Sequence, residues 1–270
     1  MKLSAHDAPV AAFPAFSDSD TINVVGLTLV ADSAGALFWP AEGVLAVADL
    51  HLEKGSSLAA RGVLLPPYDT ATTLSRLGRL VASYSPRLVV AVGDSFHDPQ
   101  GPTRISPRDR ATLKALQRGR EWVWIAGNHD PDPAEDIGGI FTDAFSFGPL
   151  TFRHDPTERY QTEWTLELGY DDSTAAAQTS LSCSPVAADG EIAGHLHPTA
   201  RISQRGRSIT RRCFATDGRR LVMPAFGAFT GGLNIRDAAF ANVFGSLDFT
   251  AHLLGERRIY TLAAARCLSD

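Results

Sequence analysis

The sequence predicts an α/β protein, and three observations carry that prediction. Two continuous apolar runs, RLVVAVG at 87–93 and EWVWIAG at 121–127, are typical of strands buried on both faces. Segments with a helical period of apolar residues lie before and between these runs. From residue 141 onward, strand-like segments dominate. The first half is therefore expected to alternate strands and helices in layers, and the second half to add mixed or antiparallel strands.

The elements of the first half follow in order. Residues 1–20 show no periodicity and are predicted to form a flexible tail. Short strands are expected within 22–31, 35–40 and 43–48, and a helix is expected within 52–62. Asp69 is predicted to cap a helix over 70–84 that has Leu74, Leu77, Leu80 and Val81 on one face. Ser106 is predicted to open a helix through Leu116, with Pro107 at its first position.

The second half contains four strand-rich segments, at 143–154, 191–197, 207–226 and 256–263. Residues 171–190 are rich in Ala, Ser and Thr and offer little to pack, so a surface loop is predicted there. No repeat divides the chain, and residues 21–270 are predicted to form a single domain.

Composition restricts the class of protein. The 270 residues carry a net charge of -5, which gives the whole molecule no strong attraction to nucleic acid or to an anionic membrane. The three cysteines form no disulfide framework, which favours a reducing compartment. The longest uncharged run, 221–235, contains Pro224 and is shorter than the ~20 apolar residues of a spanning helix. With no secretory signal at the start, a cytoplasmic protein without membrane contact is expected.

Four motifs carry the chemistry: AVADLH at 46–51, VVAVGDSFHD at 89–98, VWIAGNHDP at 123–131 and EIAGHLHP at 191–198. Each follows a short apolar strand, and ligand sites of open α/β sheets gather at the carboxyl ends of strands. Carboxylate, imidazole and amide oxygen are suitable ligands for manganese, iron or zinc. The pattern therefore predicts a metal site that includes Asp49, His51, Asp94, Asn128, His195 and His197.

Each motif also has a simpler interpretation. Asp-Leu-His is compatible with a helix cap, Gly-Asp and Gly-Asn-His-Asp with turns, and His-Leu-His with the two faces of a strand. Six of the eight histidines, however, fall at or just after predicted strand ends. This co-occurrence favours the site, whereas His6 and His252 are expected to lie outside it.

In this order, the motifs resemble those of the calcineurin-like metallophosphoesterase superfamily, from residue 43 to about 230. The segments ADLHLEKG, ARGVLLPPYDT and RRCFATDGRRLVMPAFGAFTGGL further resemble the ligase-associated DNA damage response endonuclease (PdeM) family. The resemblance implies an αββα sandwich of two mixed β-sheets flanked by helices. It also implies partners, namely an ATP-dependent DNA ligase, a helicase and an exonuclease-like protein.

The resemblance further implies a site for two divalent ions, with Mn²⁺ favoured over Fe or Zn. Asp49, His51 and His197 would bind the first ion, Asn128, His154 and His195 the second, and Asp94 would bridge them. His154, which follows the strand-like FGPLTF, is proposed as a ligand because the second ion needs a nitrogen donor.

Three further residues are expected to act on the substrate. The resemblance places His129 by the phosphate, where it supports the leaving oxygen, and Asp130 is predicted to orient its imidazole. His97 is predicted to contact the scissile phosphate.

The leading hypothesis is a phosphodiesterase with DNA endonuclease activity in DNA repair, in which a hydroxide that bridges the metals attacks phosphorus. Within residues 201–212, five arginines and no acid favour a groove that follows a phosphate backbone, although charged edge strands also prevent unwanted pairing. These are Arg201, Arg205, Arg207, Arg211 and Arg212. The alternatives are a small-molecule phosphomonoesterase or nucleotide hydrolase on the same fold and, third, a non-catalytic scaffold.

Overall fold

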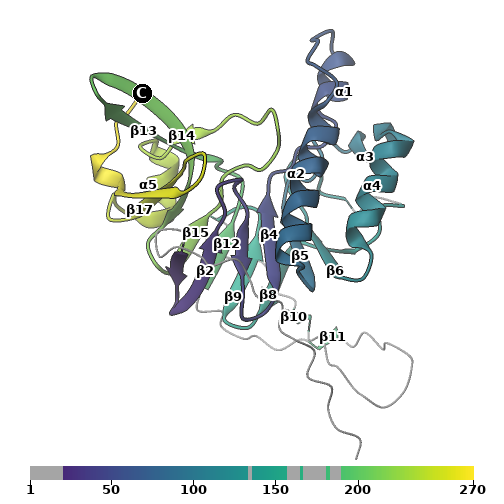
Figure 1. Cartoon of the computed structure of the whole chain (residues 1–270), viewed down its shortest axis with the longest axis horizontal. Coiled ribbons are helices and arrows are strands. Elements are labelled where there is room, and N and C mark those ends of the chain that lie inside the picture. The colour runs from purple at the N-terminus through teal and green to yellow at the C-terminus, as the bar shows by residue number, and fades with distance from the viewer. Residues whose placement is uncertain (1–20, 133–135, 157–164, 167–180, 183–189) are drawn as a thin grey trace, which may run out of the picture.

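The computed structural model describes residues 21–132, 136–156, 165–166, 181–182 and 190–270 (Figure 1). The predicted tail at 1–20 lies outside the described residues, as do 171–180 and 183–189 of the predicted loop. Two β-sheets form the middle of the molecule, with most helices beside one sheet and one helix beside the other.

The first sheet has seven strands in chain order, and its two halves differ in direction. β1 to β4 form an antiparallel meander, whereas β4, β5, β6 and β7 are parallel. Because parallel strands end at the same edge, the segments after β4, β5 and β6 meet there. The strands are β1 Thr21–Val24, β2 Leu27–Ala31, β3 Leu37–Trp39, β4 Val44–Ala48, β5 Leu88–Val92, β6 Glu121–Ile125 and β7 Ile140–Thr142.

The second sheet has the order β11-β10-β8-β9-β12-β15-β14-β13-β16, and β17 and β18 extend it from β14. β12 is parallel to both of its neighbours, β9 and β15. β11 lies inside the predicted loop and pairs with β10, and β12 begins at the last residue of that loop, so the loop prediction is wrong at residues 181–182 and 190. The strands are β8 Ala144–Phe147, β9 Leu150–Arg153, β10 Thr165–Leu166, β11 Leu181–Ser182, β12 Gly190–Ala193, β13 Pro198–Gln204, β14 Arg207–Thr216, β15 Arg220–Val222, β16 Leu233–Asn234, β17 Thr250–Leu254 and β18 Ile259–Ala263.

The helices are α1 Lys54–Ala59, α2 Asp69–Tyr84, α3 Gly101–Arg104, α4 Pro107–Gln117 and α5 Ala238–Phe244, with a short 3₁₀ helix at Ala264–Arg266. α4 begins as predicted, because Ser106 Oγ accepts a hydrogen bond from Asp109 N at 3.1 Å. The prediction for α2 is wrong in one respect: Tyr68 occupies the cap position. Asp69 instead accepts a hydrogen bond from Gly55 N at 2.9 Å and ties α2 to α1. None of the described helices is long and apolar enough to cross a membrane.

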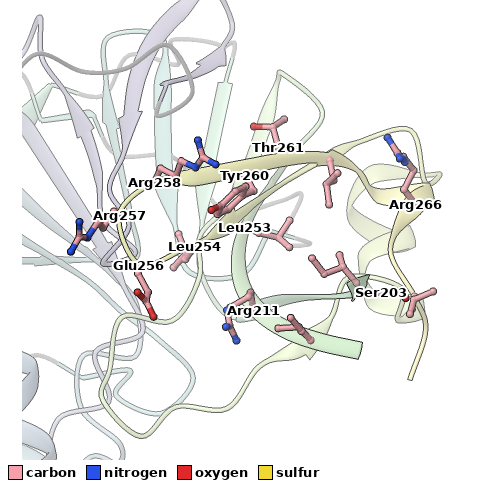
Figure 2. Close-up of a pocket in the computed structure, with 15 residues that line it drawn as sticks. Ser203, Arg211, Leu253, Leu254, Glu256, Arg257, Arg258, Tyr260, Thr261 and Arg266 are labelled. Atoms are coloured by element: carbon pink, nitrogen blue, oxygen red, sulfur yellow. The ribbon is translucent and has the colours of Figure 1, made fainter. Parts of the chain in front are cut away.

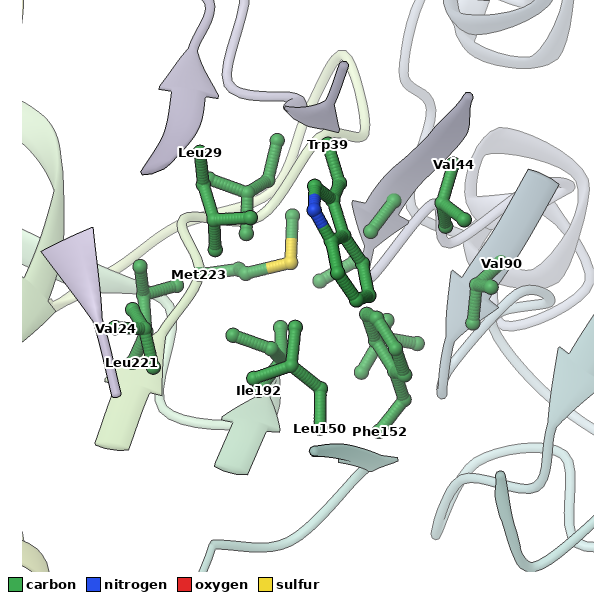
Figure 3. Close-up of a cluster of buried hydrophobic side chains, with 14 of the residues drawn as sticks. Val24, Leu29, Trp39, Val44, Val90, Leu150, Phe152, Ile192, Leu221 and Met223 are labelled. Carbon is green, nitrogen blue, oxygen red and sulfur yellow. The ribbon is translucent and has the colours of Figure 1, made fainter. Parts of the chain in front are cut away.

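Three apolar clusters separate four layers. The first lies between the sheets and includes Val90, Ile192 and Met223 (Figure 3). The second packs α2 and α4 against the first sheet, and the third packs α5 against the second sheet. The predicted αββα sandwich is therefore confirmed, with α5 as the helix of the fourth layer.

Candidate metal centre

The four motifs meet at one end of the sandwich, where the turns after their strands hold one another in place. His51 N donates to Asp94 O at 2.9 Å, and Asp49 N donates to Gly93 O at 3.3 Å, so the turns after β4 and β5 are joined. The backbone N–H of His195, after β12, donates to both oxygens of the Asp49 carboxylate, at 3.2 and 3.1 Å. Side chains from both sheets are therefore brought to one place by backbone contacts.

The backbone of this region is strained. Five of the seven predicted ligands have left-handed φ angles: Asp49 (53°), His51 (42°), Asp94 (43°), His195 (68°) and His197 (46°). This conformation costs a non-glycine residue roughly 1–2 kcal/mol and is found mainly where function requires it. All five residues lie in the turns that follow β4, β5 and β12.

Asp49, His51, Asp94 and His197 form the first group of donor side chains. One donor atom from each lies within 4.8 Å of all the others. His197 Nε2 is 3.3 Å from Asp49 Oδ1, and His51 Nε2 is 3.4 Å from His197 Nε2. His51 Nε2 is 3.7 Å from Asp94 Oδ2. Two carboxylates and two imidazoles thus face a common point.

Asn128, His154 and His195 form the second group. Asn128 Oδ1 is 2.9 Å from His154 Nε2 and 3.0 Å from His195 Nδ1, and the two histidine nitrogens are 3.1 Å apart. Asp94 Oδ1 lies 3.5 Å from His154 Nε2. One oxygen of Asp94 therefore faces each group, which is the geometry of a carboxylate shared by two ions.

The lowered pKa values of His51 and His154 suit metal binding, which requires neutral imidazole. Burial, followed by the neighbouring His197, lowers the pKa of His51 to about 2. Burial also lowers the pKa of His154, and the nearby carboxylates of Asp49 and Asp94 only partly oppose it. The pKa of His197 is raised, because its hydrogen bond to Asp49 and the surrounding acids outweigh the opposing effect of burial.

The donor set fits two divalent ions. His154 Nδ1 is buried without a hydrogen-bond partner among the described residues, and ring nitrogens face one another within both groups. Carboxylate, imidazole and amide donors match manganese, iron or zinc. The two described cysteines, Cys213 and Cys267, lie in the third apolar cluster and not in this site.

Two glycines permit this close packing. A Cβ atom at Gly93, which has a φ of 69°, would overlap the imidazole of His154. A Cβ atom at Gly127 would overlap the carboxylate and backbone of Asp94. Glycine is therefore required at these two positions because His154 and Asp94 pack directly against the glycine backbone, in addition to any role in turning the chain.

His129 and His97 lie at the edge of the first group. Their rings stack with centroids 5.2 Å apart, and His97 Nδ1 is 3.3 Å from His51 Nδ1. His129 Nδ1 is 2.8 Å from the carbonyl oxygen of His97. The expectation that Asp130 orients this ring is wrong, because Asp130 Oδ2 instead accepts a hydrogen bond from Phe96 N at 2.9 Å. Burial raises the pKa of Asp130 to about 8.

The sequence interpretation missed Lys54 and Arg104, which support the region around His97. Lys54 is the first residue of α1, and its side chain is half-buried. Burial lowers the pKa of His97 to about 4, and the positive charge of Lys54 is the second largest cause. Arg104 forms an ion pair of 2.7 Å with Asp98 and donates to Ser56 Oγ at 3.0 Å, which ties α3 to α1. The sequence did hold a signal for Lys54, because it places a positive charge only three positions after the predicted ligand His51.

The five arginines of the predicted groove belong to the β13–β14 hairpin, where neighbouring side chains on a strand alternate between faces. Arg211 lines a pocket of about 850 Å³ with Leu253 and Tyr260 (Figure 2). Arg212 instead donates from Nη1 to the carbonyl oxygen of Ala225 at 2.8 Å. The expectation of one continuous groove is therefore wrong, although Arg201, Arg205 and Arg207 lie on the same hairpin.

A smaller pocket, of about 260 Å³, opens directly on the second donor group. Asn128, His154 and His195 line it together with Arg153. The Asn128 side chain is exposed, whereas Asp49 and Asp94 are buried. The two carboxylates are therefore buried, and the site opens to solvent on the side of the second donor group.

Two adjoining groups of carboxylate, imidazole and amide donors at the strand ends of an αββα sandwich define the class of metal-dependent hydrolases. The model of the calcineurin-like phosphoesterases matches residues 43–201, which is more than half of the chain. The chain belongs to this family.

One solved structure agrees with the fold, and two others match the chain more weakly. The chain is similar to nuclease MPE from Pseudomonas putida, with 25% identity and a TM-score of 0.62 over 89% of this chain and 98% of that chain. It also matches YfcE, a phosphoesterase from E. coli (14% identity, TM-score 0.36, 82% and 98% covered). Vacuolar protein sorting 29 from Cryptosporidium parvum matches at 14% identity (TM-score 0.32, 81% and 94% covered). No curated protein matches the chain.

Proposed function

We propose that this phosphoesterase is a binuclear metal-dependent phosphodiesterase that cleaves DNA internally. The observation that carries the proposal is the position of Asp94, whose two oxygens face two different donor groups 3.7 and 3.5 Å away. The likeness to a nuclease over 89% of the chain supports a polymeric phosphodiester as the substrate.

The two donor groups support one assignment of the ligands. Asp49, His51 and His197 would hold one ion, Asn128, His154 and His195 the other, and Asp94 both. Two divalent ions held there, with Mn²⁺ favoured, would supply a hydroxide near neutral pH and would neutralise charge on the phosphate. The backbone contacts between Asp49, His51, Asp94 and His195 support this proposal.

His129 is proposed to protonate the leaving oxygen. In hydrolysis, a new P–O bond forms to the attacking oxygen and the P–O bond to the leaving alkoxide breaks, so the alkoxide requires a proton. His129 Nε2 lies 3.9 Å from Asp94 Oδ2, at the side of the donor groups. Proton transfer by a positioned histidine accelerates such steps by about 10²–10⁴-fold. His97, stacked on His129, is proposed to contact a non-bridging oxygen of the same phosphate.

The test is Mn²⁺-dependent cleavage of circular single-stranded DNA beside hydrolysis of bis(p-nitrophenyl) phosphate and p-nitrophenyl phosphate. Cleavage of the circle and preference for the diester are expected. Preference for the monoester with an intact circle would instead identify a small-molecule phosphomonoesterase or nucleotide hydrolase. Absence of both bound metal and activity would identify a scaffold. Association with a DNA ligase, a helicase and an exonuclease-like protein, and a role in DNA repair, stay predictions.

A further inference from the structure

Two arginines from different layers meet on one short segment of backbone. Arg76 of α2 donates from Nη1 to the carbonyl oxygen of Phe226 at 2.8 Å. Arg212 of β14 donates from Nη1 to the carbonyl oxygen of Ala225 at 2.8 Å. The guanidinium of Arg76 also lies over the Phe226 ring, 5.1 Å from its centroid. The two cations therefore bind consecutive peptide carbonyls.

The segment that they bind lies beside the first donor group. Phe226 N donates to Ala48 O at 2.8 Å, and Gly227 N donates to Asp49 O at 3.1 Å. The same segment later reaches the other side of that group, where Leu233 N donates to His197 O at 3.1 Å. Phe226, which Arg76 binds, thus directly precedes Gly227, whose backbone N–H binds Asp49.

The charge of this pair is not compensated. Both side chains are half-buried, and burial lowers the pKa of each guanidinium. The charge of Arg76 further lowers the pKa of Arg212. Within the part of the chain that the structure describes, no carboxylate lies within 4.0 Å of either group, whereas Arg104 pairs with Asp98 at 2.7 Å. Two like charges held together without an acid indicate a place for an anion.

We propose that Arg76 and Arg212 bind a phosphate of the substrate strand next to the one that is cleaved. This inference rests on the proposed function. Each guanidinium has five N–H donors, so one hydrogen bond to a carbonyl leaves others for phosphate oxygens. Paired arginines match phosphate geometry, and hydrogen bonds between charged groups are about twice as strong as neutral ones. The bound carbonyls hold both side chains in place before the substrate arrives.

The test compares R76Q and R212Q with the wild type on two substrates. Glutamine keeps an N–H donor for the carbonyl but removes the charge. On a single-stranded oligonucleotide, each variant should raise KM roughly 10-fold and leave kcat within about twofold. On bis(p-nitrophenyl) phosphate, which has no neighbouring phosphate, kcat/KM should stay within about twofold. The slope of log KM against log salt should fall by about 1 for each arginine removed.

R79Q is the matched control, because Arg79 lies on the same helix, is exposed and donates to Ser75 Oγ at 3.3 Å. Its charge also lowers the pKa of Arg76, as a smaller cause than burial, so R79Q removes a nearby charge that does not belong to the pair. It should keep KM and kcat on both substrates within about twofold of the wild type, and the salt slope at the wild-type value. A purely structural pair would instead lower kcat/KM on both substrates together, and that result would overturn the proposal, as would an unchanged KM on DNA.

If the wild type cleaves the small diester but not DNA, the DNA proposal fails on its own. The anion site is then tested with inorganic sulfate. A rise in the melting temperature of the wild type and R79Q that is lost in R76Q and R212Q would retain the site. An equal rise in all four proteins would reject it, because sulfate also stabilises proteins in general.

Discussion

His129 Nδ1 lies 2.8 Å from the carbonyl oxygen of His97. A carbonyl oxygen only accepts hydrogen bonds, so this contact fixes the proton on Nδ1 of His129. Nε2 then becomes the atom that gains and releases a proton, and it lies on the side of Asp94. The backbone of His97 thus sets the tautomer of His129, since the hydrogen bond at one ring nitrogen of a histidine determines which nitrogen carries the proton.

His129→Ala is therefore expected to reduce activity according to the leaving group. Cleavage of DNA, with its basic alkoxide, should fall by about 10²-fold or more. Hydrolysis of bis(p-nitrophenyl) phosphate should fall by less than about 10-fold, because nitrophenolate departs without a proton. Bound metal should stay at the wild-type amount. Equal losses on both substrates would contradict protonation by His129.

Asp94→Ala is expected to abolish turnover, with a loss of about 10³-fold or more, because both donor groups lose their shared carboxylate. It also removes the acceptor of the His129 backbone N–H, which donates to Asp94 Oδ1 at 2.9 Å. Asp94→Asn keeps an oxygen for that N–H but not the charge. Metal content and kcat of both variants separate the two contributions, and near-normal turnover of Asp94→Asn would contradict the bridging role.

Gly93→Ala is expected to remove metal from the second group, because the added Cβ would displace the His154 ring. Gly119 provides the control: its φ of 73° is close to the 69° of Gly93, and no described atom lies within 4 Å of the place that an added methyl group would take. Both variants should lose about 1–2 kcal/mol of stability from the left-handed backbone. Metal titration followed by calorimetry should show weakened binding in Gly93→Ala alone.

His252 gives the fold a dependence on pH that is independent of the metal centre. It is buried in β17 beside Thr261 Oγ1, 3.0 Å from Nδ1, and burial lowers its pKa from 6.5 to about 4. Between these values the unfolded chain binds the proton and the folded chain does not. Stability should therefore rise from pH 4 to 6.5, by up to about 3 kcal/mol, and then stay level.

His252→Gln should remove this contribution. Urea unfolding of both proteins at several pH values measures it as the difference between the two stability curves. Parallel curves across this range would show that His252 is not the group responsible.

Sequence patterns predicted much of the fold because apolar runs such as 87–93 have few alternatives. α5 was missed because Ala238–Phe244 is short, and its burial depends on tertiary contacts with strands far away in sequence. Asp69 looked like a helix cap, but its carboxylate binds Gly55 of another helix. A local pattern does not reveal such a partner.

The site was more predictable than its surroundings. The motifs located six of the seven donors, because each motif follows a strand end and strand ends converge, whereas His154 was assigned from the family resemblance and the need for a nitrogen donor. The arginine groove failed because a run along a strand is divided between two faces, which separates Arg211 from Arg212. Arg76, 136 positions before Arg212, carried no signal that could link the two residues.

The donor residues are synthesised in a fixed order along the chain. Asp49 precedes His195 by 146 positions, and the carboxylate of Asp49 accepts the backbone N–H of His195. During synthesis, Asp49, His51 and Asp94 emerge while the second sheet that supplies His195 and His197 is still incomplete. At that stage neither donor group is complete, so phosphoesterase activity is expected only after His197 has been made and has folded next to Asp49.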